Sequence, residues 1–427
     1  MRCLFLFVVS LAFAAVVSAQ GEAEMLRRAE AALTDIMVHD IFSPPVASRI
    51  YLYTNVAAYE VLVKGHPQEY ASLHGQIRNF PAIPEPTGKI SFDVAAVYAF
   101  LQVGKRLVFS DSAMQDSITA ILGAMHDHPL YAVSLEYGKK VATAIVGWAD
   151  ADQYRETRKL PRYRISRTKG KWIPTPPAYI AAIEPYWNRI RPVTLDSADQ
   201  FRPPAAPAFS TDTGSLFYHS AYDVFQAVNR LTVEQRAIAN FWDCNPFAVT
   251  MEGHLGFAIK KISPGGHWIN IVTTVSRQQH RDIMVTSAAY TITAIAIFDA
   301  FISCWDEKYR SNVIRPETYI DAYIEEGWRP ILQTPPFPEY TSGHSIVSSA
   351  SATVLSQYLG SPCVFDDDTE VEFGLPVRHF GSFRQAADEA AISRFYGGIH
   401  YRAAIETGQV SGRRIGEWVM TKISLKK

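Results

Sequence analysis

Helix-length segments follow one another along almost the whole chain, and residues that start or stop a helix bound them. Pro44 and Pro45 open a segment that reaches Lys64 and ends at Gly65, the usual order of proline at a helix start and glycine at its end. Alternating strand patterns between turn signals are scarce, so the sequence predicts an all-α helical bundle. We expect further helices over residues 23–38, 92–108, 112–125, 131–150, 232–243, 285–309, 342–359 and 400–418.

Composition indicates a globular protein without a general affinity for polyanions. Of the residues, 48% are hydrophobic and 19% are charged, which is typical of a globular protein. With 427 residues, the chain is long enough for one large domain or two ordinary ones. The 41 basic and 42 acidic residues are mixed along the chain, which argues against nucleic acid or an anionic membrane as partner. Any anion site must therefore be local.

The N-terminus resembles a secretory signal. Arg2 precedes an apolar run over residues 4–17, and a small-residue cleavage site at 17–19 precedes Gln20. We expect residues 1–19 to be a signal peptide and the mature chain to be secreted or periplasmic. A membrane anchor is the weaker interpretation, because the run is shorter than a bilayer span. The apolar stretch 285–305 contains Asp299 and is expected to be a buried core helix.

Three cysteines remain in the predicted mature chain: Cys244, Cys304 and Cys363. They allow one disulfide at most, and their spacing fits no zinc pattern. We interpret them as buried small hydrophobic residues.

A proline-rich segment separates the N-terminal half of the chain from the C-terminal half. Nine prolines lie within residues 160–210, together with Trp172 and Trp187. Proline at this density breaks helices, whereas the tryptophans argue against a flexible linker. We expect an ordered strap across the bundle, with residues 20–205 forming an N-terminal helical region and residues 206–427 a C-terminal domain that binds an oxyanion.

Three blocks of the C-terminal half carry candidate functional residues. In the first, Lys308 and Arg315 are seven residues apart and precede Pro316. On a helix, a spacing of seven residues is two turns, so both cations would project from the same face. Pro316 would then end the helix. Alone, this pattern is typical of a solvated helix face.

The second block brings a proline-rich segment to Ser342, Gly343 and His344 at the expected start of a helix. Unpaired N–H groups and the helix dipole favour an anion there, and a histidine can exchange a proton near neutral pH. Alone, it is also explained as an ordinary capped helix.

The third block contains Arg394 and His400, separated by Gly397 and Gly398. The two glycines would break the regular backbone and let both side chains aim at one point. Alone, this block is better explained by a surface arginine and a core histidine. Together the blocks supply two arginines, a lysine, a Ser-Gly turn and two histidines, which is what a buried tetrahedral oxyanion requires.

These blocks resemble the superfamily of vanadium-dependent haloperoxidases, class A acid phosphatases and type 2 phosphatidic acid phosphatases. The pattern Lys-x6-Arg-Pro, Pro-Ser-Gly-His and Ser-Arg-x5-His-x3-Asp is matched from Lys308 to His400. Thr341 replaces the proline of the second motif. Ala404 replaces the closing aspartate, which in the phosphatases orients the nucleophilic histidine. A backbone carbonyl is expected to hold His400 instead, because Glu406 lies further round the helix.

The resemblance favours the haloperoxidase branch, because the chain is long, helical and lacks the membrane spans of the lipid phosphatases. It implies that His400 binds vanadium, that His344 handles peroxide protons, and that vanadate, as a Lewis acid, activates peroxide toward halide. The implied oxyanion ligands are Lys308, Arg315, Ser342, the Gly343 N–H and Arg394. Aromatic residues beside a halide site would correspond to Trp305 and Phe337, with core packing equally plausible, and Asp243 would support an arginine.

Two alternatives remain at this stage. One is a soluble phosphomonoesterase with His400 as nucleophile and His344 as acid, for which phosphate would occupy the vanadate position. A carboxylate within hydrogen-bond reach of His400 would favour this alternative. The other is a non-catalytic phosphate-binding helical protein.

Overall fold

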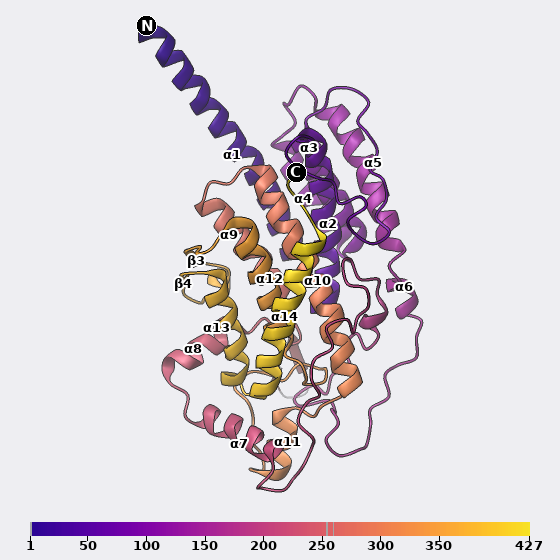
Figure 1. Ribbon diagram of the computed structural model, residues 1–427, viewed down its shortest axis with the longest axis vertical. Coiled ribbons are helices and arrows are strands. Elements are labelled where there is room, and N and C mark those ends of the chain that lie inside the picture. The colour runs from indigo at the N-terminus through magenta and orange to yellow at the C-terminus, as the bar shows by residue number, and fades with distance from the viewer. Residues whose placement is uncertain (1, 253–254, 259) are drawn as a thin grey trace.

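The computed structural model describes residues 2–252, 255–258 and 260–427, and helices dominate it (Figure 1). The first half contains α1 (Arg2–His39), α2 (Pro44–Gly65), α3 (Phe92–Leu107), α4 (Asp111–Gly123), α5 (Tyr131–Asp150), α6 (Tyr154–Thr157) and the 3-10 helix η1 (Trp187–Arg189). The second contains α7 (Leu216–Asn229), α8 (Val233–Phe241), α9 (Pro264–Gln278), α10 (Ile283–Ser311), α11 (Pro316–Tyr323), α12 (Gly343–Leu359), η2 (Val371–Phe373), α13 (Phe383–Tyr396) and α14 (Arg402–Lys422).

Strands are confined, within the described residues, to two small antiparallel pairs. β1 (Val249–Glu252) pairs with β2 (Leu255–Ala258), and β3 (Phe365–Asp367) pairs with β4 (Arg378–Phe380). The predicted all-α class is confirmed.

Helix α10 is the centre of the bundle. It packs against α2 of the first half and α12 of the second, and one continuous hydrophobic cluster includes residues of all three helices. Among the described residues α10 is the one helix long and apolar enough to cross a membrane, yet 94% of its apolar window is buried in the protein. It is therefore the core helix that the sequence predicted. The boundary at residue 205 stays a prediction.

Local capping signals account for the helix ends that the sequence predicted. Thr232 and Gln235 form a capping box at the start of α8, and Ser43 caps α2 in front of its two prolines. At the end of α12 the φ of Gly360 is +100°, a conformation that favours glycine. Among the described residues, five α-helices were not predicted: the short α6 and the longer α7, α9, α11 and α13.

The proline-rich strap is ordered and crosses the bundle as expected. Trp172 and Trp187 are fully buried. The carboxylate of Asp299 on α10 accepts hydrogen bonds from the backbone N–H groups of Val193 (2.8 Å) and Thr194 (2.7 Å), and from the Thr194 hydroxyl (2.6 Å). One buried carboxylate therefore fastens the strap to the central helix.

The first part of α1 extends away from the remaining helices (Figure 1). Its later residues Leu26, Ala29 and Leu33 are fully buried in the main core. The predicted signal peptide thus coincides with the projecting part, and its cleavage stays a prediction.

We predict that Asp299→Asn lowers the free energy of unfolding by about 2–3 kcal/mol, because charge-assisted hydrogen bonds to the strap become neutral ones inside the core. Denaturant unfolding measures this change. Asp196→Asn is the control, since this strap carboxylate is 72% exposed and should change stability by less than about 0.5 kcal/mol. Equal stability of the two variants would contradict the anchoring role of Asp299.

Candidate functional site

Lys308 and Arg315 do not share a helix, so the predicted helical face was wrong. Lys308 lies in the last turn of α10, which ends at Ser311, and Asn312 takes a left-handed conformation with φ of 51°. Arg315 is the residue before α11, and Pro316 begins that helix at a position where proline is well tolerated. The turn at Asn312, and not helical periodicity, brings the two cations to one site.

The Lys308 ammonium group is fully buried and surrounded by backbone oxygens. Its Nζ donates to the carbonyl groups of Pro338 (3.0 Å), Glu339 (3.0 Å) and Thr341 (2.6 Å). Burial lowers the pKa of Lys308 to about 7. The segment that precedes Ser342 is therefore fixed by this cation.

Arg315 is also fully buried, and carbonyl groups from two blocks hold it. Nε donates to Phe337 O and Nη1 to Ile399 O, both at 2.9 Å, and Nη1 lies 3.2 Å from His400 Nε2. Burial lowers the pKa of Arg315 to about 10. Its Nη2 has no protein partner among the described residues.

The second block forms the start of α12 as predicted. The Ser342 hydroxyl caps the helix by accepting from Ser345 N (3.3 Å), and it also contacts Ser345 Oγ at 2.8 Å. Gly343 is the first residue of the helix and lines the pocket together with His344. The Nε2 atom of His344 is buried and finds no partner in the described part of the chain.

In the third block, Arg394 lies in the last turn of α13 and His400 lies just before α14. Gly398 between them has a φ of +77°, which confirms the predicted break. Arg394 Nη1 donates to Trp242 O at 2.7 Å, whereas its Nε and Nη2 have no partner among the described residues.

The three blocks converge on one small pocket, in which a volume of about 30 Å³ is open to the centres of water-sized molecules. Gly343, His344, Arg394 and His400 line it. Four buried nitrogens on its residues and on the neighbouring Arg315 lack a partner within the described part of the chain: Arg315 Nη2, Arg394 Nε, Arg394 Nη2 and His344 Nε2. Buried donors normally have partners, so this set fits a multidentate oxyanion such as vanadate or phosphate.

Glu339 orients His400 and was not predicted. Its Oε1 lies 2.7 Å from His400 Nδ1 and also accepts from Tyr401 N at 3.1 Å. The prediction that a backbone carbonyl group holds the His400 ring was therefore wrong. Ala404, where the family has aspartate, instead accepts from Ser342 N through its own carbonyl group. The only sequence signal for Glu339 was its place between Phe337 and Ser342.

The same contact defines the state of the His400 ring. Burial, reinforced by Arg315 and Lys308, holds the pKa of His400 well below its usual range, so the ring is neutral. With Nδ1–H donating to Glu339, the lone pair of Nε2 accepts from Arg315 and faces the pocket. Such a ring can ligate a metal or attack phosphorus, and metal-binding histidines commonly carry a carboxylate on the other nitrogen. A carboxylate that contacts His400 is therefore compatible with both a haloperoxidase and a phosphomonoesterase, and it does not separate these two activities.

Trp305 and Phe337 form an aromatic wall of this pocket. Their ring centroids are 4.9 Å apart, and both residues line the cavity beside His344 and His400. Lys308 Nζ lies 5.1 Å from the Phe337 ring centroid. Core packing alone therefore does not account for them.

Asp243 lies near Arg394 but is paired elsewhere. Its charge raises the pKa of Arg394 against the larger lowering effect of burial. The hydrogen-bond partner of its Oδ2 is Lys261. The predicted support of an arginine is thus electrostatic and not a direct hydrogen bond.

We predict that Glu339→Gln weakens vanadate binding about 10–100-fold, because the orienting carboxylate of His400 loses its charge. Equilibrium dialysis against vanadate measures the affinity. Glu406→Gln on the exposed side of α14 is the matched control and should bind as the parent does. Unchanged affinity in Glu339→Gln would mean that the contact does not set the ring orientation.

Comparison with known proteins agrees with this pocket. A family model described as the VCPO second helical-bundle domain matches residues 322–425. The structure of a bacterial vanadium-dependent iodoperoxidase is similar over 94% of this chain and 97% of that chain, with 48% sequence identity and a TM-score of 0.90. A search of curated proteins finds no match.

Two further structures share the fold at lower identity. Holo-type and apo-type structures of a bacterial vanadium-dependent chloroperoxidase each show 18% identity, with TM-scores of 0.69 and 0.67. They cover 90% and 89% of this chain, and 93% and 95% of theirs. The identity and coverage of the iodoperoxidase, together with the oxyanion pocket, show that this chain belongs to the vanadium-dependent haloperoxidase family.

Proposed function

We propose that this protein is an exported haloperoxidase that oxidises halide with hydrogen peroxide at a bound vanadate, with iodide as the first candidate halide. The observation that carries the proposal is the group of four buried nitrogens that have no partner among the described residues and lie in or beside the pocket that His400 lines. Iodide comes first because the similar structure at 48% identity is that of an iodoperoxidase. Export rests on the signal-like residues 1–19.

The residues of the pocket have distinct proposed roles toward vanadate. His400 Nε2 would bind the metal, while Arg315, Arg394, Ser342 and the Gly343 N–H would contact its oxygens. Lys308, whose three N–H bonds already go to carbonyl groups, would contribute its charge. Bound vanadate supplies a Lewis acid that polarises peroxide without changing its own oxidation state. The protein supplies the charge and the fixed geometry, which cost no reorganisation when the reaction occurs.

His344 is suited to carry the proton. Burial and the nearby Arg394 hold the pKa of His344 well below its usual range, so the ring is neutral and can accept. Its unpartnered Nε2 would take a proton from incoming peroxide and return one to the departing oxygen. A negatively charged oxyanion in the pocket would raise its pKa toward neutrality.

Trp305 and Phe337 are proposed to bound the halide position. A large polarisable anion can contact the positive edges of aromatic rings, and the cations of Lys308 and Arg315 lie near the Phe337 ring. The aromatic wall would also exclude water from the place where halide attacks.

Phosphomonoester hydrolysis is the second candidate. The contact between Glu339 and His400 favours it as much as the first, since a nucleophilic histidine needs the same orientation. His344 would then protonate the leaving group. The two activities are separable by assay.

We predict vanadate-dependent oxidation of iodide by hydrogen peroxide, suppressed by added phosphate and reduced at least a thousandfold in His400→Ala. Triiodide absorbance follows the reaction, and p-nitrophenyl phosphate hydrolysis is measured in parallel. The exposed His219→Ala is the control and should retain activity. Phosphate ester hydrolysis that vanadate inhibits, without iodide oxidation, would instead establish the second candidate.

We predict that oxyanion affinity falls as the pH rises above about 7. A bound anion favours charged Lys308, whose pKa in the free protein is about 7, so binding above that pH takes up a proton. Sulfate is the probe, because its own charge is constant across this range. Calorimetry should show up to about a fivefold loss of affinity between pH 7 and 8. Lys308→Met should bind more weakly but without this pH dependence; the same slope in both proteins would exclude Lys308 as its source.

A further inference from the structure

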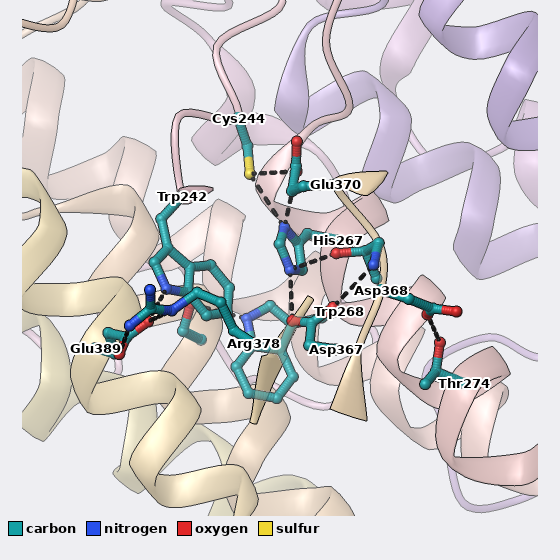
Figure 2. Close-up of polar contacts among 12 residues, drawn as sticks. Trp242, Cys244, His267, Trp268, Thr274, Asp367, Asp368, Glu370, Arg378 and Glu389 are labelled. Carbon is teal, nitrogen blue, oxygen red and sulfur yellow. Dashed lines mark hydrogen bonds and ion pairs between the residues drawn. The ribbon is translucent and has the colours of Figure 1, made fainter. Parts of the chain in front are cut away.

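A second group of metal-binding side chains lies beside the oxyanion pocket. It consists of Cys244 after α8, His267 in the first turn of α9, Asp367 in β3 and Glu370 before η2 (Figure 2). We call these four residues the His267 cluster. All of them are buried, and nothing in the oxyanion mechanism uses them.

Three donor atoms of the His267 cluster surround one point. His267 Nδ1 lies 3.5 Å from Cys244 Sγ and 3.1 Å from Glu370 Oε1, and Sγ lies 3.9 Å from Oε1. Ligand atoms of a tetrahedral zinc site are about 3.3–3.6 Å apart, given metal–ligand distances of about 2.0–2.3 Å. Small side-chain shifts would bring these atoms to three corners of such a site and leave the fourth corner for water.

The other ring nitrogen of His267 contacts a carboxylate, as is common for histidines that bind a metal. His267 Nε2 lies 2.9 Å from Asp367 Oδ2 and 2.7 Å from Thr369 Oγ1. Asp367 is itself held, because its Oδ1 accepts from Thr369 N at 3.1 Å. A carboxylate on this nitrogen keeps its proton there and presents the Nδ1 lone pair to Cys244 and Glu370.

We propose that Cys244, His267 and Glu370 bind a zinc ion, with Asp367 orienting the histidine. One thiolate, one imidazole and one carboxylate are a borderline-soft donor set that suits Zn²⁺ better than Mg²⁺ or Ca²⁺. Sequence spacing did not reveal the site, because its three ligands come from separate elements and include a single cysteine.

The zinc ion would position one wall of the oxyanion pocket. Cys244 lines that pocket, and the carbonyl group of Trp242 two residues earlier accepts from Arg394 Nη1. The Trp242 ring stacks on His267, with centroids 4.3 Å apart. An ion at Cys244 would therefore fix the segment that holds Arg394.

Metal content and Co²⁺ substitution of the full chain test the site without the peroxidase reaction. We expect one equivalent of zinc by mass spectrometry after dialysis. After removal of zinc, Co²⁺ should bind with a thiolate-to-cobalt absorption in the near ultraviolet. Cys244→Ser should lose this band, and Glu370→Gln should lower Co²⁺ affinity at least tenfold.

Two controls separate this site from the vanadate pocket and from misfolding. Cys363→Ser removes another buried cysteine and should keep the cobalt band, as should His400→Ala. Circular dichroism checks that each variant is folded. Folded parent protein without stoichiometric zinc and without the cobalt band would overturn the proposal in favour of a protonated His267 held by two carboxylates. Binding unchanged in both Cys244→Ser and Glu370→Gln would also overturn it.

Discussion

Backbone carbonyl groups hold the three buried cations of the oxyanion site, and the site depends on that arrangement. Lys308 contacts three carbonyls just before Ser342, Arg315 contacts those of Phe337 and Ile399, and Arg394 contacts that of Trp242. Carbonyl dipoles solvate the cations without neutralising them, and the carboxylates of Glu339 and Asp243 offset only part of their charge. The remaining positive charge explains the affinity expected for a multiply charged oxyanion, while burial lowers the pKa values of Lys308 and Arg315.

Glu339 connects two parts of the site. Its backbone carbonyl group accepts from Lys308, while its carboxylate orients His400. Burial raises the pKa of Glu339 to about 7, against the opposing effect of Arg315 and Lys308. This carboxylate contacts His400 Nδ1, the position on the ring that the family pattern gives to an aspartate at position 404, although it comes from a different part of the chain.

The fold supports the site from the central helix outward. α10 ends in the turn that separates Lys308 from Arg315, and Asp299 on the same helix fastens the strap. The strap in turn accepts from Trp305 Nε1 through Ile183 O at 3.2 Å, so it backs the aromatic wall of the pocket. The proposed zinc site would provide comparable support behind Arg394.

Features that depend on neighbours in sequence could be predicted: the capped helices, the break at Gly398, the buried core helix and the residues of the three anion-binding blocks. They follow from local backbone preference and from short motifs. Partners that meet only in the folded chain could not be predicted. Glu339 is 61 residues from His400, and Cys244 is 126 residues from Glu370. Lys308 and Arg315 do reach one site, as predicted, but the reason given for it was wrong. Helical periodicity assumes a continuous helix, and the left-handed residue Asn312 ends the helix between them. The sequence by itself determined the chemical groups of the pocket; tertiary packing decided which groups hold and orient them, because such contacts depend on distance in space and leave no fixed spacing along the chain.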